Sequence, residues 1–197
     1  MTEGPAWKDF HAPAPGFFSA GVLDMAPGLL GCLLVHDTRD GQVSGLITET
    51  EAYHESEPSC HAFGGENTRN WPMFRRGGLA YVYRIYGIHH CFNVCTGDEG
   101  TGEAVLIRSL IPVSGIGVMA RNRGTGDTER LCRGPGNLCR ALGIDLSLNG
   151  ADLGRGPLRI LVPGVEGAIT PRRTTRVGIT KASEREWRFV AEGLEHP

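Results

Sequence analysis

A cluster of acidic side chains beside a tyrosine and a histidine is the part of the sequence best suited to chemistry. The stretch TETEAYHESEPSCHAFGG, residues 48–65, carries four glutamates around Tyr53 and ends at His61 and two glycines. Such clusters are most often the solvated end of a strand. In the alternative, one carboxylate, Glu51, works as a general base on a substrate that Tyr53 and His61 hold.

Two polar residues elsewhere in the sequence are suited to orient such a base. Asn93 and Arg108 each stand inside an otherwise apolar segment that is typical of a strand. A buried polar side chain needs a hydrogen-bonding partner, and a carboxylate such as Glu51 suits either residue. A general base such as Glu51, flanked by Asn93 and Arg108, would stay ionised and oriented.

Arginine and tyrosine side chains are interleaved just after this stretch. They are Arg69, Arg75, Arg76 and Arg84, with Tyr81, Tyr83 and Tyr86. This combination suits a surface that follows a phosphate backbone and stacks bases, although ordinary cross-strand aromatic packing would also produce it. Tyr86 favours the first interpretation, because a residue at a hairpin tip can replace a base in a duplex stack.

The spacing of histidines and cysteines does not indicate a metal site. The chain has seven histidines and six cysteines, but no HExxH motif and no CxxC pair. We therefore expect reduced cysteines that pack as small apolar groups, no metal and no cofactor. A metal-dependent hydrolase that uses the histidines remains as an alternative.

Length and composition indicate one globular domain. The 197 residues, 40% hydrophobic and 21% charged, suffice for one well-buried core. We expect a poorly structured N-terminus over 1–16 and a single domain over 17–197. No signal peptide and no apolar run of membrane-spanning length are visible, so we expect a soluble cytoplasmic protein without a membrane partner.

Charge is unevenly distributed along the chain. The net charge of −2 argues against a generally basic nucleic-acid binder. Residues 1–68 hold 2 basic and 10 acidic residues, whereas residues 69–133 hold 9 arginines and 5 acidic residues. A local basic face therefore remains open.

The elements that position these residues are mainly predicted strands. An apolar strand over 33–36 and a second strand over 43–52 flank the turn signal DTRDG and should pair as a hairpin. In the second strand one face should carry residues of the same parity, provided that no bulge intervenes. These residues are Val43, Ile47, Glu49, Glu51 and Tyr53.

The rest of the chain predicts an α+β fold: a mainly antiparallel curved sheet, short surrounding helices and a protruding β-hairpin. The hairpin joins strands 79–85 and 89–95 through Tyr86-Gly87-Ile88. A long loop over 54–78 precedes it, and EAVLIRSLIPV is a further strand. The predicted helices are one capped by Asp24, one that Pro112 opens, and one that begins at Pro135 with Leu138, Ala141 and Leu142 on its apolar face. The closing strands are PLRILVPG, VGITKA and EWRFVAEG.

Seven sequence blocks resemble, in order, the alkyladenine DNA glycosylases, also called the 3-methyladenine DNA glycosylase family. They extend from about residue 17 to 190, and their ordered combination is far more specific than any single block. The blocks are ETEAY at 49–53, HAFGG at 61–65, TRN-x-x-MF at 68–74, YVYxIYG at 81–87 with Asn93, VLIRSL at 105–110, LCxGPxxLCxAL at 131–142 and RVGI at 176–179.

The resemblance implies catalytic and base-binding roles for the matching residues. Glu51 matches the glutamate that activates water, and Arg108 matches the arginine that helps to hold this water and the glutamate. The residues that match the walls of the pocket for the flipped base are Tyr53, His61 and Tyr83. Glu49, Glu55 and Glu57 have no match of this kind and are expected to be bystanders.

The resemblance also implies how lesions and DNA are recognised. Asn93 matches a residue at the pocket floor that screens purines by their exocyclic groups. Tyr86 matches the residue that intercalates where the base has left the duplex, and the DNA backbone would meet Arg69, Arg75, Arg76 and Arg84. Asn137 is a departure, because it stands where relatives often have a lysine.

The function implied is a base-excision-repair glycosylase that flips alkylated or deaminated purines out of double-stranded DNA. It would act as a monomer, without metal or cofactor, in the cytoplasm and associated with the genome through DNA. A bifunctional glycosylase needs an amine for a Schiff base, and no lysine lies between Lys8 and Lys181, so we predict a monofunctional enzyme that leaves an abasic site. A lesion-binding protein without excision activity is the alternative. Methylpurines, hypoxanthine and ethenoadenine all remain open as lesions.

Overall fold

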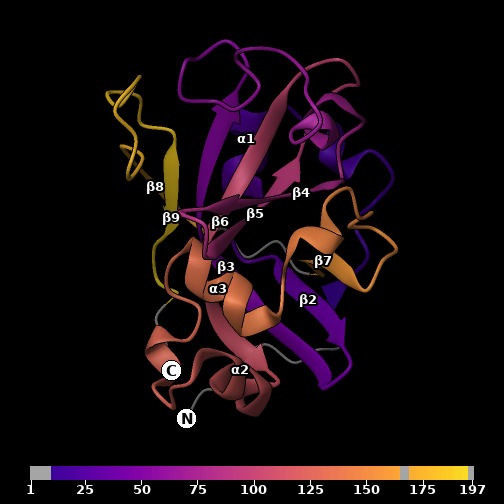
Figure 1. Ribbon diagram of the computed structural model, residues 1–197, viewed down its shortest axis with the longest axis vertical. Coiled ribbons are helices and arrows are strands. Elements are labelled where there is room, and N and C mark those ends of the chain that lie inside the picture. Colours follow the sequence, from indigo (N-terminus) through magenta and orange to yellow (C-terminus); the bar gives the residue numbers. More distant parts are fainter. Residues whose placement is uncertain (1–9, 165–168, 195–197) are drawn as a thin grey trace.

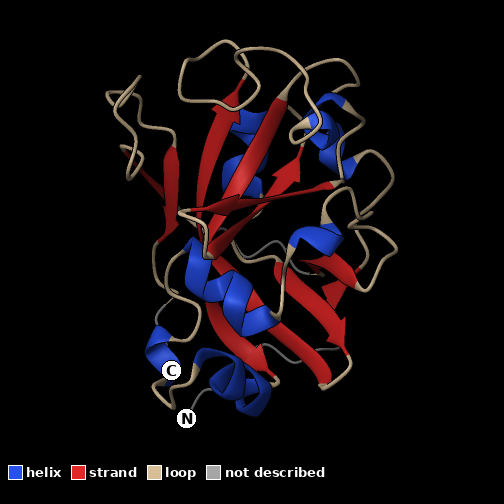
Figure 2. Ribbon diagram, viewed as in Figure 1, coloured by secondary structure: helices blue, strands red, loops and turns tan. Residues whose placement is uncertain are grey.

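The computed structural model describes residues 10–164 and 169–194 of the chain (Figure 1). Within them, antiparallel strands form one large sheet with short helices around it, as Figure 2 shows. The strands are β1 (Phe10–His11), β2 (Leu33–Thr38), β3 (Gly41–His54), β4 (Ala80–Ile85), β5 (His89–Cys95), β6 (Glu103–Ser114), β7 (Leu158–Pro163), β8 (Pro171–Thr174) and β9 (Arg188–Ala191). The helices are α1 (Val22–Gly28), α2 (Ile116–Arg123) and α3 (Pro135–Leu142). The predicted α+β class with a mainly antiparallel sheet is confirmed.

Strand β3 is the centre of the sheet. The strand order is β1-β7-β2-β3-β6-β5-β4, and β9 pairs with both β3 and β8. The first half of β3 pairs with β2, which confirms the predicted hairpin, and residues 49–51 pair with β9. Because β6 runs along the other edge of β3, the acidic end of β3 lies between two neighbouring strands.

Two bulges in the β3–β6 ladder decide where the acidic side chains point. The pairs around them are Ile47↔Leu110, Glu49↔Ser109 and Thr50↔Ile107. Thr48 is therefore an extra residue of β3, and Arg108 is an extra residue of β6. Since side chains alternate along a strand, the extra Thr48 turns Glu49 and Glu51 to the face opposite Ile47. The predicted common face for Ile47 and the glutamates is wrong for this reason.

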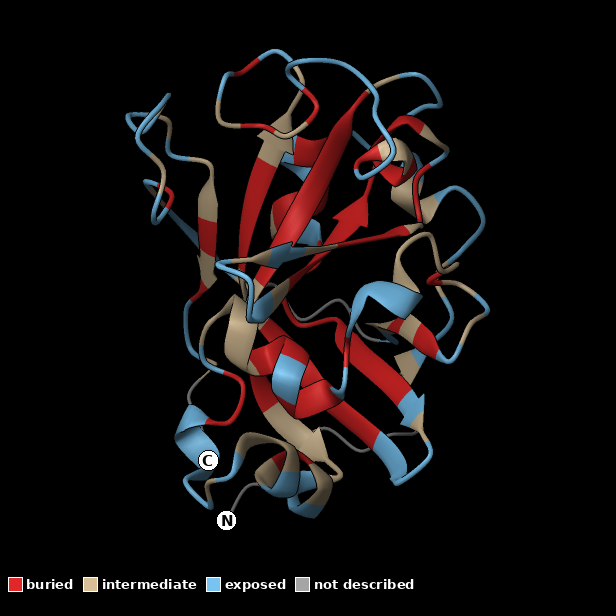
Figure 3. Cartoon of the chain, in the orientation of Figure 1, coloured by how far each residue is buried: buried red, intermediate tan, exposed pale blue. Residues whose placement is uncertain are grey.

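The main core lies on the other face of β3. Ile47 and Ala52 are fully buried in it together with side chains of α1 and α3 (Figure 3). The Thr50 hydroxyl donates a hydrogen bond to the Ala26 carbonyl of α1, 2.7 Å away. Helix α3 covers β5 and β6, and its apolar face (Leu138, Ala141 and Leu142) is buried as predicted. The carboxylates of β3 thus point away from the packed core.

The predicted hairpin is formed by β4 and β5, and its tip is exposed. Tyr86 and Gly87 both have positive φ, 52° and 72°, which is the geometry of the tight turns that match the twist of a β-hairpin. Tyr86 is 84% exposed. An aromatic side chain held at positive φ and away from its own core is uncommon, and such positions cluster at functional sites.

Two predicted helix starts are wrong. Helix α1 begins at Val22 after Gly21, so Asp24 lies inside the first turn and does not cap the helix. Strand β6 continues through Pro112 to Ser114, and α2 begins only at Ile116 after Gly115. Proline is tolerated there because the β3 ladder shifts register between Ser44 and Gly45, the residue that faces Pro112.

The C-terminal part differs from the prediction at one strand. The segments PLRILVPG and EWRFVAEG contain β7 and β9, as predicted, whereas residues 177–182 form bends and no strand, and the extra strand is β8. Of the expected unstructured start, 1–9 lie outside the described residues, and Phe10–His11 pairs with β7. No helix within the described ranges is long and apolar enough to cross a membrane.

Candidate active site

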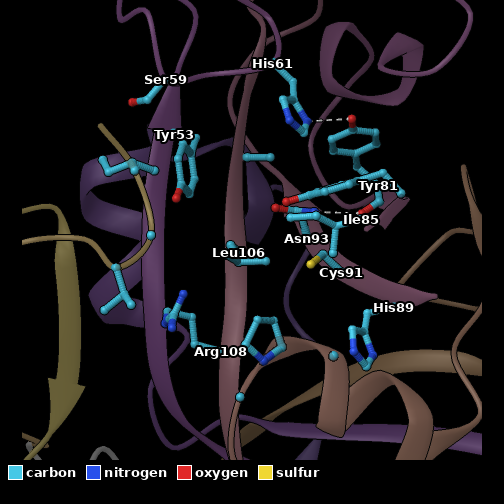
Figure 4. Close-up of a pocket in the computed structure, with 18 of the residues that line it drawn as sticks. Tyr53, Ser59, His61, Tyr81, Ile85, His89, Cys91, Asn93, Leu106 and Arg108 are labelled. Atoms are coloured by element: carbon cyan, nitrogen blue, oxygen red, sulfur yellow. Dashed lines mark hydrogen bonds between the residues drawn. The ribbon is translucent and has the colours of Figure 1, made fainter. Parts of the chain in front are cut away.

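A cavity of about 520 Å³ lies beside the hairpin on the carboxylate face of the sheet. Its wall comes from β3, β4, β5 and β6, from the loop after β3, from the start of α3 and from residues 177–179. Figure 4 shows Tyr53 on one side and His61, Tyr81 and Asn93 on the other, with Arg108 at the far end. The bulged β3–β6 ladder therefore supplies one wall, and the hairpin supplies the wall that faces it.

Glu51 is the carboxylate next to this cavity, and it is 0% exposed. The Tyr53 hydroxyl donates a hydrogen bond to Glu51 Oε2 at 2.8 Å. The Val177 N–H donates to Oε1 at 2.8 Å, and Arg108 Nη1 lies 3.3 Å from the same oxygen. All three partners are donors, which suits an ionised carboxylate held in one orientation. Burial, with the charge of Glu51, raises the pKa of Tyr53 well above its usual range, so its hydroxyl keeps the proton it donates.

Glu49 is part of the same charged group. Arg108 Nε donates to Glu49 Oε1 at 2.9 Å, and Arg188 Nε of β9 donates to the same oxygen. Arg188 faces Glu51 in the β3–β9 register, so the four charges lie together on one face of the sheet. The residues alternate in sign in the order Arg188, Glu49, Arg108, Glu51.

Glu57 and Glu55 also have partners in the structure, and the expectation that they take no part in the chemistry stays a prediction. Glu57 is fully buried in an ion pair with Arg176, which also donates to the Ala52 carbonyl at 2.9 Å. The Arg176 guanidinium lies 4.7 Å from the centroid of the Tyr53 ring. Glu55 accepts a hydrogen bond from the Gly102 N–H at 2.7 Å. These contacts fix the loop after β3 against the sheet.

His61 is a neutral group on the opposite wall. Its Nδ1 lies 2.9 Å from the Tyr81 hydroxyl, and its ring meets the Tyr83 ring edge-on with 4.6 Å between centroids. Burial, assisted by the charge of Arg69, lowers the pKa of His61 to about 4. The imidazole is therefore uncharged at neutral pH, with one nitrogen engaged by Tyr81.

Asn93 lies on the same wall. It makes no hydrogen bond with Glu51, although Glu51 was one of the partners that the sequence suggested for it. Its Nδ2 donates to the Tyr81 carbonyl at 3.0 Å, because the two residues face each other across the β4–β5 ladder. Asn93 is buried and lines the cavity. The cross-strand bond fixes which way its amide points.

The four arginines near the hairpin differ in their surroundings. Arg75 pairs with Glu66 at 2.8 Å, and Arg76 pairs with Asp152 at 2.7 Å. Arg69 lies 6.0 Å from the centroid of the ring of Tyr83, a residue that lines the cavity, and Arg84 is exposed on β4. Within the described residues neither Arg69 nor Arg84 has an ion-pair partner, so these two are the better placed to meet an anion.

Several cavity residues were not predicted from the sequence. They are Ser59, Ile85, His89, Cys91, Leu106 and residues 134–137 and 177–179. Three of them could have been found from the alternation of side chains along a strand, because residues two positions apart share a face. Ile85 lies two positions after Tyr83, Cys91 two before Asn93, and Leu106 two before Arg108. The contact of Val177 with Glu51 spans 126 positions of sequence, and no local pattern predicts it.

The described residues hold no candidate metal centre: among them, no three His, Cys, Asp or Glu side chains come close enough to share an ion. All six cysteines are buried and unpaired, as expected for reduced thiols. Burial raises the pKa of Cys32, Cys60 and Cys132, each to about 12, which makes them weak nucleophiles.

Comparison with known proteins gives a consistent result. Residues 16–195 match the model of the family described as methylpurine-DNA glycosylase (MPG). Three of the most similar relatives carry the name "Putative 3-methyladenine DNA glycosylase". The protein of Methanoculleus marisnigri is 47% identical over 91% of this chain and 95% of its own length. The proteins of Rubrobacter xylanophilus and Rhodopseudomonas palustris strain BisB5 are 46% and 47% identical, over 84% and 88% of this chain and 86% and 83% of their own lengths.

The family model covers the cavity and all the residues around Glu51, because its match begins before α1 and ends after β9. The relatives extend over most of this chain at more than 45% identity. The chain therefore belongs to the methylpurine-DNA glycosylase family, and the predicted enzyme class, a monofunctional DNA glycosylase of the 3-methyladenine type, is confirmed with it.

Proposed function

We propose that the protein removes damaged purines from double-stranded DNA by flipping the base into the cavity and hydrolysing its N-glycosidic bond with a water that Glu51 activates. The observation that carries this proposal is the buried Glu51 carboxylate, which is held by Tyr53, Val177 and Arg108, three residues that line a tyrosine-rich cavity. Membership of the methylpurine-DNA glycosylase family supports DNA as the substrate.

The aromatic walls supply the free energy that base flipping requires. Extruding a base costs about a few kcal/mol, and stacking on an aromatic ring returns roughly 1–3 kcal/mol per base. Tyr53 of β3 and Tyr83 of β4 both line the cavity, so two aromatic rings are available to stack on a purine there. Many N-alkylated purines carry positive charge, which the π-faces of the two rings attract. Neutral lesions rely on stacking and hydrogen bonds.

The polar groups of the cavity give selectivity. Asn93 has a fixed amide, since its Nδ2 donates to the Tyr81 carbonyl, and it therefore cannot rotate to accommodate every purine. His61 is neutral and also fixed, through Tyr81. A normal purine whose exocyclic group clashes with this fixed floor binds less well than a lesion that fits, because buried polar groups without partners are costly.

The chemistry follows from the acceptor capacity of Glu51. A carboxylate has about four acceptor positions: Tyr53 occupies one on Oε2, Val177 occupies one on Oε1, and the Arg108 guanidinium pairs with Oε1. The remaining position on Oε2 accepts a proton from water as the water oxygen bonds to C1′. The electron pair of the C1′–N bond leaves with the base. The sugar passes through an oxocarbenium-like state that the negative charge of Glu51 stabilises.

Tyr86 and the unpaired arginines suit the DNA side of the reaction. Inserted into the duplex, Tyr86 restores the stacking that the flipped base leaves behind. Arg69 and Arg84 meet phosphates, while Arg75 and Arg76 contribute less because each is paired with a carboxylate. The protein would act as a monomer on a damaged duplex, in the cytoplasm with the genome.

The experiment that tests this proposal uses end-labelled duplexes that each carry one ethenoadenine, hypoxanthine or 7-methylguanine. Each duplex is incubated with the protein in EDTA, and half of each sample is then treated with hot alkali. We expect strand scission only in the alkali-treated half, because hydrolysis leaves an intact abasic site. Borohydride added during the reaction should trap no covalent protein–DNA adduct.

Other outcomes would refute the proposal in distinct ways. Tight binding to one lesion with no scission would make the protein a lesion sensor. Scission that EDTA abolishes would indicate a metal-dependent hydrolase. Efficient borohydride trapping would indicate a Schiff base and hence a lyase mechanism.

A further inference from the structure

We infer that Glu49 is a positioning residue, which holds Arg108 so that the guanidinium pairs with Glu51 only at Oε1 and leaves the second acceptor position of Oε2 free for the attacking water. The inference rests on the proposed role of Glu51 and goes beyond it, because it explains why a second glutamate stands two positions earlier on the same face. Three observations carry it: the contacts of Arg108, the acceptor count of Glu51 and the contact of Arg188.

The contacts of Arg108 show that its orientation is shared between two carboxylates. Nε donates to Glu49 Oε1 at 2.9 Å, whereas Nη1 lies 3.3 Å from Glu51 Oε1. Arg108 is the extra residue of the β6 bulge, and its side chain is mostly buried. The shorter contact is the one with Glu49, so Glu49 sets the plane of the guanidinium. In Figure 4 this guanidinium lies at the end of the cavity, in the direction of the Tyr53 hydroxyl.

The acceptor count explains why it matters that Arg108 meets only one oxygen of Glu51. Arginine binds an isolated carboxylate preferentially through two parallel bonds, one to each oxygen. On Glu51 such a pair would add a bond to Oε2, which already accepts from Tyr53. The position that the attacking water needs would then be filled by Arg108. The bond to Glu49 opposes this rotation.

Arg188 explains why Glu49 itself is not the base. Its Nε donates to the same Glu49 oxygen as Arg108, so two guanidinium groups hold that carboxylate. Neither carboxylate itself lines the cavity, but all three partners of Glu51 (Tyr53, Val177 and Arg108) line it, whereas of the two partners of Glu49 only Arg108 does. The two carboxylates of β3 therefore have different tasks: Glu49 orients an arginine, and Glu51 faces the sugar.

The test compares Glu49→Gln with wild type in single-turnover excision and in equilibrium binding to the same lesion duplex. We expect the excision rate to fall about tenfold, the size expected for one lost charge-assisted hydrogen bond. The Kd and the Tm should stay within about twofold and a few degrees of wild type. Glu192→Gln is the matched control, because Glu192 pairs with Arg172 on the exposed surface, and it should leave the rate unchanged.

A double-mutant cycle separates positioning from a merely structural role. If Glu49 acts through Arg108, then Glu49→Gln has no further effect on the rate once Arg108→Met is present. Glu49→Asp shortens the side chain by one methylene, and we expect it too to have no further effect on the rate once Arg108→Met is present. The cycle can therefore be completed with either variant at position 49 if the other fails to fold. The inference would be overturned if Glu49→Gln slowed excision equally with and without Arg108→Met. It would also be overturned if Glu49→Gln alone excised at the wild-type rate.

Glu51→Gln in the same assay distinguishes this inference from the proposed function. Loss of excision in Glu51→Gln, with Glu49→Gln fully active, would refute the role of Glu49 alone. Full activity of Glu51→Gln would refute the proposed function, whatever Glu49 does.

Discussion

The central feature at the scale of single residues is a division of labour among side chains that look alike in the sequence. Four glutamates stand within nine positions of one another, yet each has a different environment. Glu51 contacts three residues that line the cavity, Glu49 binds two arginines, Glu57 is buried with Arg176 and Glu55 accepts a backbone N–H. Only the first combines burial, donors alone as partners and a neighbouring cavity, and this combination is what a general base requires.

His61 gives a prediction about pH. Its pKa is lowered to about 4 in the folded protein, against an ordinary value near 6.5, so between these values the unfolded chain binds more protons than the folded one. The contribution of His61 to stability should therefore be complete above about pH 6.5 and decline as the pH falls towards 4. We expect the Tm of wild type to drop more between pH 7 and pH 5 than that of His61→Gln. Nitrogen NMR that finds His61 protonated at pH 6 would contradict this.

Individual site residues were predictable to the extent that they break a local pattern. Arg108 and Asn93 were identified because they interrupt apolar strands, and the resemblance to known glycosylases supplied Tyr53, His61 and Tyr83. The role of Glu49 was not predictable, because its acidic neighbours have the same composition and only the β6 and β9 partners distinguish them. Likewise, the choice of Tyr81 as partner of Asn93 depends on strand register, which a single strand does not reveal.

At the scale of elements, the hairpin and the bulged β3–β6 ladder perform separate functions. The ladder sets the direction of the charged side chains, since one extra residue on a strand moves all later side chains to the other face. The hairpin carries an exposed aromatic residue at its tip. The sequence predicted the hairpin correctly, because β-rich arms flank a Tyr-Gly-Ile turn. It did not predict the bulge at Thr48, since no residue type marks a bulge of this kind.

The hairpin tip gives a prediction that separates DNA binding from stability. Replacing Tyr86 by glycine removes an exposed ring and places at φ 52° a residue that tolerates this conformation. We expect the Tm of Tyr86→Gly to equal or exceed that of wild type. Affinity for a lesion duplex should fall by about 1–3 kcal/mol, the value of one lost base stack. Fluorescence anisotropy with a labelled duplex measures the affinity, and an unchanged Kd would show that Tyr86 does not intercalate.

At the scale of the whole molecule, a buried ion pair joins distant parts of the chain. Arg176 precedes the segment that donates to Glu51, and it binds Glu57 in the loop after β3. Its guanidinium also lies against the rings of Tyr53 and Trp187, at 4.7 and 5.2 Å from their centroids. The C-terminal region thereby completes the cavity wall that β3 begins.

Breaking this ion pair should destabilise the protein strongly. Arg176→Met leaves the Glu57 carboxylate buried without its partner, and removal of one member of a buried pair costs about 3–5 kcal/mol. The double variant Arg176→Met with Glu57→Gln removes the unpaired charge and should recover part of this loss. Urea unfolding measures both. A double variant no more stable than Arg176→Met would show that lost packing of Arg176, and not the unpaired charge, accounts for the effect.

Salt dependence tests how the whole surface meets DNA. The net charge is −2, and Arg75 and Arg76 are already paired with carboxylates. Few phosphates are therefore neutralised on binding, and log K should fall with log salt concentration with a slope between about −2 and −4. Affinity measured across a salt series gives this slope. A value steeper than about −6 would require a basic surface that the pairing of Arg75 and Arg76 argues against.

The most direct test of the account is the single-turnover excision rate of Glu51→Gln, measured with its Kd for the same lesion duplex. Glutamine keeps the shape of the side chain but cannot take a proton from water, so the account predicts that excision slows by about a thousandfold or more while the Kd changes little. Glu192→Gln, on the exposed surface, should match wild type in both quantities. A Glu51→Gln enzyme that folds, binds the lesion and excises it at the wild-type rate would contradict the assignment of Glu51 as the working carboxylate.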